Sequence, residues 1–407
     1  MLDLVKQVNF RFSMENIDLS ISRLSDLLGF HDNLSNFLLD QDKYKIEKSK
    51  FFFSNYIKSI KFIPVLQHFG IGQYYLYIYP YNLDEIDFKI LLSNSFQKIK
   101  YPISMDKSTS LFIKYIWPYQ NPNLSYAHWL TKSKKDVREF CSFLIKKIFQ
   151  IFHFNYNLTS DNWIYDSNRF KIYMQNILFN PKYKVQIAKI KEFNIGKLSA
   201  TDCRGPDSID FNNLTKIYNW HSIDIKSYLL TKKLSILNPI IDLLEKEFIF
   251  PYLKLKNLDL LEKVYIILPN INQELNKQII EIFSFFNLGF IYEIEGEYFI
   301  YGMAEEVKFE NGIMIKLYFP DCNLNEFIKL FELLFHYLKI EHYVILNDLV
   351  DGKNLLKSIY GNLNFLNEYN PLKNLRWNPK DKIWMNNKLF NERFEPIYHD
   401  LIPEEKD

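Results

Sequence analysis

The segment LFIKYIWP (111–118) and the segment IMIKLYFP (313–320) share one pattern, Ile-Lys-x-x-aromatic-Pro. Each is a run of β-branched, aromatic and other apolar residues that ends at a proline, which is typical of a buried strand. Their positions differ by about half of the 407 residues in the chain. This spacing indicates that one structural unit is present twice.

Two further pairs of segments match in the same order in both halves. FIPVLQHFGIGQYYLYIYPYN (62–82) and FIFPYLKLKNLDLLEKVYIILPNIN (248–272) each contain a proline, a turn and an apolar strand that ends in a proline followed closely by asparagine. NILFNPKYK (176–184) and NLRWNPKDK (374–382) are identical at five of nine positions. Three matches in one order predict a tandem duplication.

The second half begins with a helical module. Apolar residues at helical spacing predict helices over 222–234 and 238–248, and a β-ribbon begins with IFPYLKL (249–255). Asn238 is a favoured N-cap, and Pro239 is well tolerated at the first helical position. Two helices, a short turn and a ribbon are the outline of a winged helix-turn-helix.

Alternating strands and amphipathic helices follow the helical module. In the second half we expect strand 263–269, helix 272–286, hairpin 289–302, strand 313–320, helix 324–338 and strand 341–348. In the first half we expect helices 20–30, 33–41 and 45–59, a strand from Phe62, strand 73–80, helix 83–96, strands 98–104 and 111–118, helix 134–152 and strand 152–159. The predicted fold class is α+β, a tandem repeat of a winged helix-turn-helix and a ferredoxin-like (βαββαβ) domain.

These elements divide the chain into six predicted parts. They are a first winged-helix-like module (1–64), a first ferredoxin-like domain (65–160), an end piece and linker (161–208), a second winged helix-turn-helix (209–256), a second ferredoxin-like domain (257–349) and a C-terminal end piece (350–407). Trp377 and Trp384 are expected to anchor the last part on the body of the protein.

The second half resembles the leucine-responsive/AsnC regulator family. The residues that carry the resemblance are Leu244, Glu245, Ile249, Leu258 and Leu260 around the recognition helix and the following strand, and Gly296-Glu297-Tyr298 in the second hairpin. The resemblance extends over 209–349 and more loosely over 16–160. It implies a DNA-binding winged helix and a ferredoxin-like domain that senses a small ligand or oligomerises. This chain departs from the family in holding two of each.

Lysines near the predicted winged helices are the candidate contacts to DNA phosphates. Segment 43–61 contains six lysines and one glutamate, a net charge of +5, whereas helix 238–248 has a net charge of −2. The first half is therefore predicted to be the better DNA reader. The predicted DNA-binding residues are Lys43, Lys45, Lys48, Lys50, Lys226, Lys232, Lys233 and Asn238.

The predicted function is that of a transcription regulator that binds double-stranded DNA, with ligand sensing or oligomerisation through the ferredoxin-like domains. A homodimer is left open as a further partner. The alternative is a protein-interaction scaffold whose winged helices have lost contact with nucleic acid.

No recognisable catalytic or metal-binding pattern is present in the sequence. FGIGQYY (69–75) lacks the third glycine of a dinucleotide fingerprint, and the eight histidines have no metal-ligand spacing. Cys203 lies beside Arg204, but its position between the two halves indicates a linker rather than a nucleophile. We therefore expect no enzymatic activity, no metal and no cofactor, and the sequence identifies no effector ligand.

Composition indicates a soluble globular protein of the cytoplasm. The net charge is +2, apolar residues make up 48%, and only 11 glycines are present, which excludes disordered and collagen-like chains. Three cysteines cannot form a disulfide framework. The longest apolar stretch, 140–152, is interrupted by Lys146 and Lys147, so no membrane span is expected.

Overall fold

The computed structural model describes residues 57–82, 96–102, 110–118, 137–152, 156–157, 162–163, 165–180, 191–194, 205, 208–220, 234–255, 262–286, 288–300, 303, 306–320, 324–347, 349–351, 375–378, 380 and 383–386. Every structural statement below concerns these residues. The predicted helices 20–30 and 33–41, and most of helices 45–59, 83–96 and 222–234, lie outside the described residues.

Four antiparallel strands of the first half form one sheet unit. They are β2 (Ile71–Pro80), β3 (Phe96–Pro102), β4 (Leu111–Pro118) and β5 (Val137–Phe152). Their order in space is β5-β2-β4-β3, so the fourth strand lies beside the first and the third beside the second. This is the strand order of a βαββαβ unit.

The second half repeats this strand order with its helices in place. The strands β10 (Glu262–Leu268), β11 (Leu288–Ile300), β12 (Val307–Phe319) and β13 (Val344–Leu346) lie in the order β13-β10-β12-β11. Helix α11 (Gln273–Phe283) connects β10 to β11, and helix α12 (Leu324–Tyr337) connects β12 to β13. The side chain of Asn272 accepts a hydrogen bond from the backbone N–H of Leu275 at 2.8 Å and so caps α11. The predicted α+β fold class is confirmed.

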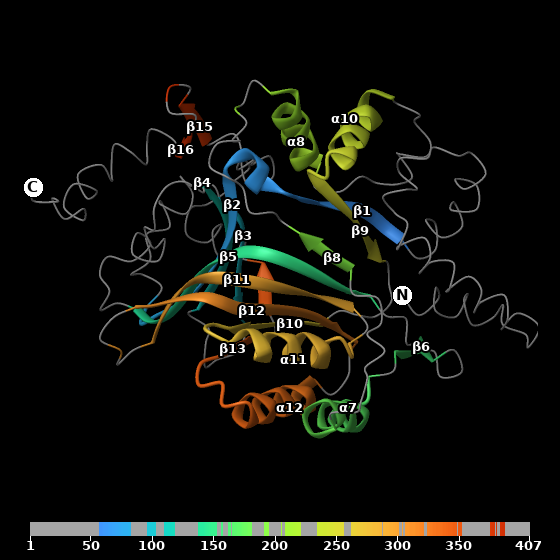
Figure 1. Cartoon of the computed structure of the whole chain (residues 1–407), viewed down its shortest axis with the longest axis vertical. Coiled ribbons are helices and arrows are strands. Elements are labelled where there is room, and N and C mark those ends of the chain that lie inside the picture. The colour runs from blue at the N-terminus through green and yellow to red at the C-terminus, as the bar shows by residue number, and fades with distance from the viewer. Residues whose placement is uncertain are drawn as a thin grey trace, which may run out of the picture.

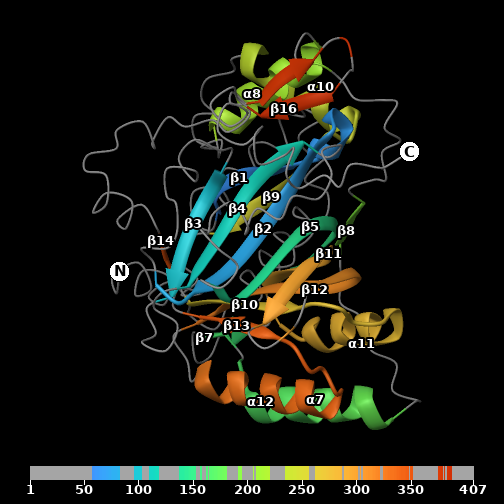
Figure 2. The same ribbon diagram turned by 90° about the vertical axis from the view of Figure 1, so that its left-hand side faces the viewer.

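The two units share one curled sheet. Strand β5 pairs with β11 from end to end, and β8 (Lys191–Asn194) adds a further strand on β5. At the outer ends of the strand path, β13 pairs with β10, and β14 (Leu349–Asp351) pairs with β3. Because β13 and β14 follow each other in the chain, the chain itself joins both ends of the path. Figures 1 and 2 show the resulting change in strand direction from β3 to β10.

One face of the second unit, called here the outer face, is covered by α11, α12 and α7 (Ser167–Phe179) (Figure 1). Helix α7, which is not among the predicted elements, begins after the N-cap Asp166. Phe170 of α7 is fully buried and fixes this helix on the other two. Its ring contacts those of Phe283, Phe285, Phe286, Phe327 and Phe331, with centroids 5.0–6.5 Å away.

The opposite face of the sheet, called here the inner face, packs against itself. The ring of Phe112 on β4 lies 5.1 Å from that of Tyr265 on β10, between centroids, and Tyr75 lies 6.4 Å from Tyr292. Four strands separate β4 from β10 along the sheet path. These contacts therefore show that the inner faces of the two units face each other.

A helical module lies at the opposite end of the molecule from α7 and α12 (Figure 1). It contains α8 (Ile209–Trp220), α10 (Leu234–Glu245) and the short 3-10 helix η2 (Leu66–Phe69). Strand β1 (Ile57–Pro64) pairs with β9 (Ile249–Leu255), so each half of the chain supplies one strand of the ribbon. The ring of Phe69 contacts those of Phe211 and Phe248 at 5.7 and 5.5 Å and connects η2 to the module.

The start of the second predicted helix of this module is wrong. Helix α10 begins at Leu234, so Asn238 and Pro239 lie inside it instead of at its N-terminus. A proline within a helix removes one backbone hydrogen bond. The burial of Ile240 and Leu243 further along α10 offsets that loss.

The predicted helix over 134–152 is also wrong, because Val137–Phe152 form strand β5. This strand pairs on both edges and is buried on both faces, so its apolar residues do not alternate with polar ones. Lys146 lies at a bulge, where its Nζ contacts the carbonyl oxygen of Glu310 at 3.1 Å and the carboxylate of Glu295 at 3.3 Å. In the sequence, a long apolar run interrupted by a central lysine has the pattern of an amphipathic helix, which explains the wrong prediction.

Three smaller predictions are corrected by the described strands. The predicted helix 45–59 conflicts with β1, which already begins at Ile57. Helix 83–96 conflicts with β3 at Phe96. Within the strand predicted over 152–159, the described residues are Phe152, which ends β5, and β6 (Tyr156–Asn157), which pairs with β7 (Asn162–Trp163).

The third pair of matched segments adopts two different structures. Asn176–Phe179 end helix α7, whereas the matching segment contains β15 (Leu375–Asn378), which pairs with β16 (Ile383–Asn386). The shared residues are Asn, Pro and Lys, which do not favour one element. The tandem duplication and the six domain boundaries therefore stay predictions.

The C-terminal hairpin contacts the body of the protein at Gly205. A Cβ atom on Gly205 would lie 2.8 Å from Cε2 of Trp377. The glycine therefore lets the indole ring pack directly on the backbone. The expectation that Trp377 anchors the C-terminal part is confirmed at this contact.

Candidate functional site

A row of directly opposed residues crosses the inner face of the second unit. Lys316 on β12 lies between Tyr265 on β10 and Phe290 on β11, and Phe290 lies opposite Gln150 on β5. These four side chains share one face because Tyr265, Phe290 and the flanking Ile148 and Met314 all belong to the inner-face core.

The ammonium group of Lys316 lies on aromatic rings. Its Nζ is 4.8 Å from the ring centroid of Tyr318, 5.5 Å from that of Phe290 and 5.8 Å from that of Tyr265. A cation over ring faces gains about 0.5–2 kcal/mol per contact and keeps its full charge. The rings thus hold a positive charge on an otherwise apolar face.

Gln150 is a buried amide at the end of this row. It is 1% exposed, and neither its Oε1 nor its Nε2 has a hydrogen-bond partner within the described part of the chain. Leaving a buried polar group unpaired costs about 1–3 kcal/mol. Such groups in native proteins are usually satisfied by a water, an ion or a ligand. Two strand spacings separate Gln150 from Lys316, about 10 Å between backbones.

The first unit carries an equivalent pair. Lys114 on β4 lies opposite Tyr75 on β2, and its Nζ is 5.7 Å from the centroid of that ring. The Tyr75 ring is stacked on Phe112 at 5.3 Å and on Phe143 at 5.8 Å. Lys114 and Lys316 thus occupy corresponding positions in the two units, each opposite a tyrosine.

We call Lys114, Tyr75, Tyr265, Lys316, Phe290, Tyr318 and Gln150 the inner-face site. Its two halves meet through the Phe112–Tyr265 and Tyr75–Tyr292 contacts described above. Both lysines belong to the shared Ile-Lys-x-x-aromatic-Pro pattern, which by itself does not mark them as functional.

Burial keeps two phenols and one thiol of the inner face neutral. Burial raises the pKa of the Tyr318 phenol well above its usual range. The pKa of Tyr77 is raised by burial and then by Glu139, whose Oε2 accepts a hydrogen bond from the Tyr77 hydroxyl at 3.4 Å. Burial likewise raises the pKa of the Cys141 thiol. These phenols and this thiol therefore add no negative charge near the two lysines at neutral pH.

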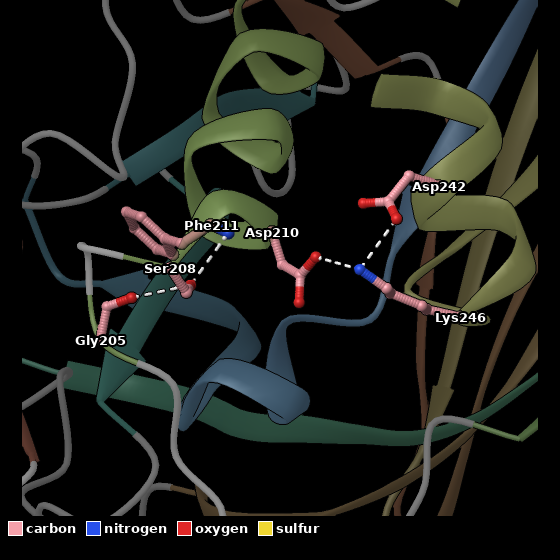
Figure 3. A network of polar contacts seen from close by, with 6 residues as sticks. All are labelled: Gly205, Ser208, Asp210, Phe211, Asp242 and Lys246. Carbon is pink, nitrogen blue, oxygen red and sulfur yellow. Dashed lines mark hydrogen bonds and ion pairs between the residues drawn. The ribbon is translucent and has the colours of Figure 1, made fainter. Parts of the chain in front are cut away.

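The helical module contains a separate polar cluster, whose groups bond to one another (Figure 3). The Nζ of Lys246, just after α10, lies 2.7 Å from the carboxylate of Asp210 on α8 and 2.8 Å from that of Asp242. Hydrogen bonds to Asp210 and then Asp242 raise the pKa of Lys246. Ser208 Oγ accepts from the N–H of Phe211 at 3.2 Å and donates to the carbonyl of Gly205 at 2.9 Å, so it caps α8.

The residues predicted to bind DNA are not brought together by the described structure. Lys43, Lys45, Lys48, Lys50, Lys226, Lys232 and Lys233 lie outside the described residues. Asn238 lies within α10. At the C-terminal end of this helix, Lys246 is paired with carboxylates, and Glu245 and Glu247 are exposed. The second module thus offers little positive charge to a phosphate backbone in its described part.

The other sequence candidates give no further site. Cys203 lies outside the described residues. The ring of His342 packs on that of Tyr298, with centroids 5.3 Å apart. No group of three His, Cys, Asp or Glu side chains in the described segments could hold a metal ion. Among the helices that the structure describes, none has both the length and the apolar character of a membrane span.

Comparison with known proteins gives distant matches only. No protein-family model and no curated protein matches the chain. Two solved structures match at 9% identity and a TM-score of 0.35, over 74% of this chain and 79% of the matched one. They are crystal structures of the siroheme decarboxylase NirDL, one of them in complex with an iron-uroporphyrin III analogue. Because that protein is an enzyme, these matches contradict the expectation of no enzymatic activity, and this exclusion is dropped.

Proposed function

We propose that the protein binds a small anionic ligand with a flat apolar part at the inner-face site. The observation that carries the proposal is the row formed by Tyr265, Lys316, Phe290 and Gln150. Lys316 supplies a positive charge, and the rings supply an apolar surface. The side-chain amide of Gln150 supplies an N–H₂ donor group and a carbonyl acceptor. Few polar groups on a largely aromatic surface are typical of small-molecule sites.

The charge of the ligand follows from the charges around it. Lys114 and Lys316 are cationic, whereas the buried phenols of Tyr77 and Tyr318 are neutral because burial raises the pKa of each. A cationic ligand would be repelled by the positive charge of both lysines, and a neutral one would gain little from that charge. A carboxylate or another anion fits the inner-face site better than either.

Binding of paired probe compounds tests the charge preference. Isothermal titration calorimetry compares 2-naphthoate with its neutral counterpart 2-naphthamide on the full chain and on the variant Lys316→Met, which keeps an apolar stem but removes the charge. A hydrogen bond to a charged group contributes about 1.5–3 kcal/mol. We therefore expect the full chain to bind naphthoate roughly tenfold or more tightly than the amide, since about 1.4 kcal/mol is a factor of ten.

The control is Lys329→Met, which removes an exposed lysine of α12 on the other side of the sheet. It should keep the preference for naphthoate, whereas Lys316→Met should lose it. Equal affinities for the two compounds in the full chain, or an unchanged preference in Lys316→Met, would refute the proposal.

Binding of double-stranded DNA is a second candidate function, supported by the charge of the first half. Segment 43–61 has a net charge of +5, in contrast to the acidic end of α10. Together with ligand binding, this activity would make the protein a ligand-responsive transcription regulator. The AsnC-like order of winged helix and ferredoxin-like unit supports this combination.

Salt dependence of DNA binding tests the second candidate. Affinity for a duplex is measured between low and moderate salt for the full chain and for the triple variant Lys45→Gln, Lys48→Gln and Lys50→Gln. Each lost phosphate contact should reduce the slope of log K against log salt by about one unit. A slope that the triple substitution leaves unchanged would contradict DNA binding through these lysines.

A further inference from the structure

Exposed apolar side chains are concentrated on α7 and α12. Of the large apolar side chains that are exposed within the described residues, four lie on these two helices. They are Ile172 and Phe179, each 59% exposed, Leu333, 61% exposed, and Tyr337, 52% exposed. Single exposed apolar residues are ordinary, but a group on neighbouring helices marks an interaction surface.

The two helices lie side by side and run in the same direction. At their N-terminal ends, Ser167 Oγ donates a hydrogen bond to Oε2 of Glu326 at 2.8 Å. At their C-terminal ends, the rings of Phe179 and Tyr337 meet with centroids 5.1 Å apart. In both Figure 1 and Figure 2 the pair forms the end of the molecule opposite α8 and α10.

The apolar residues form one patch on this pair. Ile172 and Phe179 are seven residues apart and therefore lie on one side of α7. Leu333 and Tyr337 are four residues apart and lie on one side of α12. The contact between Phe179 and Tyr337 joins the two sides. We call these four residues the α7–α12 patch.

The charges on the two helices are complementary. Between Ser167 and Phe179, α7 carries Arg169 and Lys171 and no acidic residue, and Arg169 pairs with the carboxylate of the cap residue Asp166 at 3.7 Å. Helix α12 carries Glu326, Glu332 and Lys329, a net charge of −1 with neutral histidine. A two-fold axis parallel to the helices would place α7 of one copy on α12 of the other. Basic residues would then face acidic ones twice, and the apolar C-terminal ends of the four helices would meet around the two-fold axis.

We propose that the α7–α12 patch is the interface of a homodimer of this protein. The occupant is a second copy because one two-fold arrangement satisfies both the apolar patch and the opposite charges. The interface does not involve the inner-face site, so the two proposals stand independently. Lys171 of one copy is expected to lie near Glu332 of its partner, and each pair occurs twice in the dimer.

Sedimentation velocity of the full chain tests this interface. At tens of micromolar the protein should sediment at twice the mass of the 49.1 kDa chain. The double variant Phe179→Asp and Leu333→Asp should be monomeric, because it places charges at the centre of the patch. The matched control Ile209→Asp changes a side chain that is 75% exposed on α8 and should remain dimeric.

A charge exchange gives a readout that does not depend on folding. Lys171→Glu alone and Glu332→Lys alone should each raise the dimer dissociation constant about tenfold or more, because like charges then face each other. The two substitutions together should restore the dimer. A monomeric full chain, a dimer that survives Phe179→Asp and Leu333→Asp, or a charge exchange without recovery would overturn the proposal.

Discussion

Gly296 lies in the β5–β11 pair that joins the two units of the sheet, and its replacement by alanine should destabilise this joint. It faces Phe143 across the β5–β11 pair. A Cβ atom added to Gly296 would lie 2.0 Å from the carbonyl oxygen of Ser142 and 2.7 Å from Cα of Phe143. Carbon and oxygen atoms in contact between strands are about 3.3–3.6 Å apart. The backbone of β5 would therefore have to move by about 1 Å or more.

The size of the effect follows from what blocks the methyl group. Overpacking in a well-packed region costs about 1–3 kcal/mol, and here the obstacle is backbone that cannot rotate away. We expect Gly296→Ala to lower the free energy of unfolding by about 3 kcal/mol or more. Urea denaturation followed by near-ultraviolet circular dichroism measures this change through the midpoint and the slope.

A neighbouring substitution provides the control. Glu295→Ala changes the residue before Gly296 on β11 and removes a part-exposed ion pair with Lys146 of β5. It should lower the free energy of unfolding by less than about 1 kcal/mol. If the free energy of unfolding of Gly296→Ala lies within about 1 kcal/mol of that of the original protein, β5 and β11 are not joined as described. The shared sheet would then be wrong.

Three further predictions concern packing and polar contacts. Phe170→Ala should lower the free energy of unfolding by about 3–5 kcal/mol, measured by urea denaturation, because five phenylalanine rings lose a fully buried partner. Ser208→Ala should cost about 1 kcal/mol through the loss of the α8 cap, in the same assay. Asp210→Asn should lower the pKa of Lys246, measured by carbon NMR of its Cε, because the first of its two carboxylate partners loses its charge. Since that pKa is raised in the folded protein, the stabilisation by this contact is complete below the ordinary lysine pKa of 10.5 and is lost as pH rises through the raised value.

Much of the second half of the fold is predictable from its sequence because local and tertiary preferences agree there. The hairpin predicted over 289–302 is wrong, because Leu288–Ile300 form the single strand β11, which pairs with β12. Ile313, Ile315 and Leu317 alternate with inner-face residues, and Asn272 supplies a cap at the start of α11. Strand β5 is the opposite case. Its burial on both faces depends on pairing with β11, whose residues lie more than a hundred positions away, so the local pattern favours a helix.

The candidate site is only partly visible in the sequence. The shared Ile-Lys-x-x-aromatic-Pro pattern contains Lys114 and Lys316, so the sequence does mark these positions as equivalent. It cannot show that Lys114 lies over the ring of Tyr75 or Lys316 over that of Tyr265, because these two tyrosines come from other strands. The sequence also cannot show that the side chain of Gln150 is buried without a hydrogen-bond partner, because both properties arise only in the folded sheet.

The side-chain amide resonance of Gln150 tests the central claim most directly. It is assigned in a ¹⁵N–¹H spectrum of the full chain by its loss in Gln150→Leu. The account predicts that saturation with 2-naphthoate moves this resonance in the full chain, and that Lys316→Met abolishes the movement at the same ligand concentration. A Gln150 resonance that stays fixed while 2-naphthoate is bound would contradict the assignment of the inner face as the ligand site.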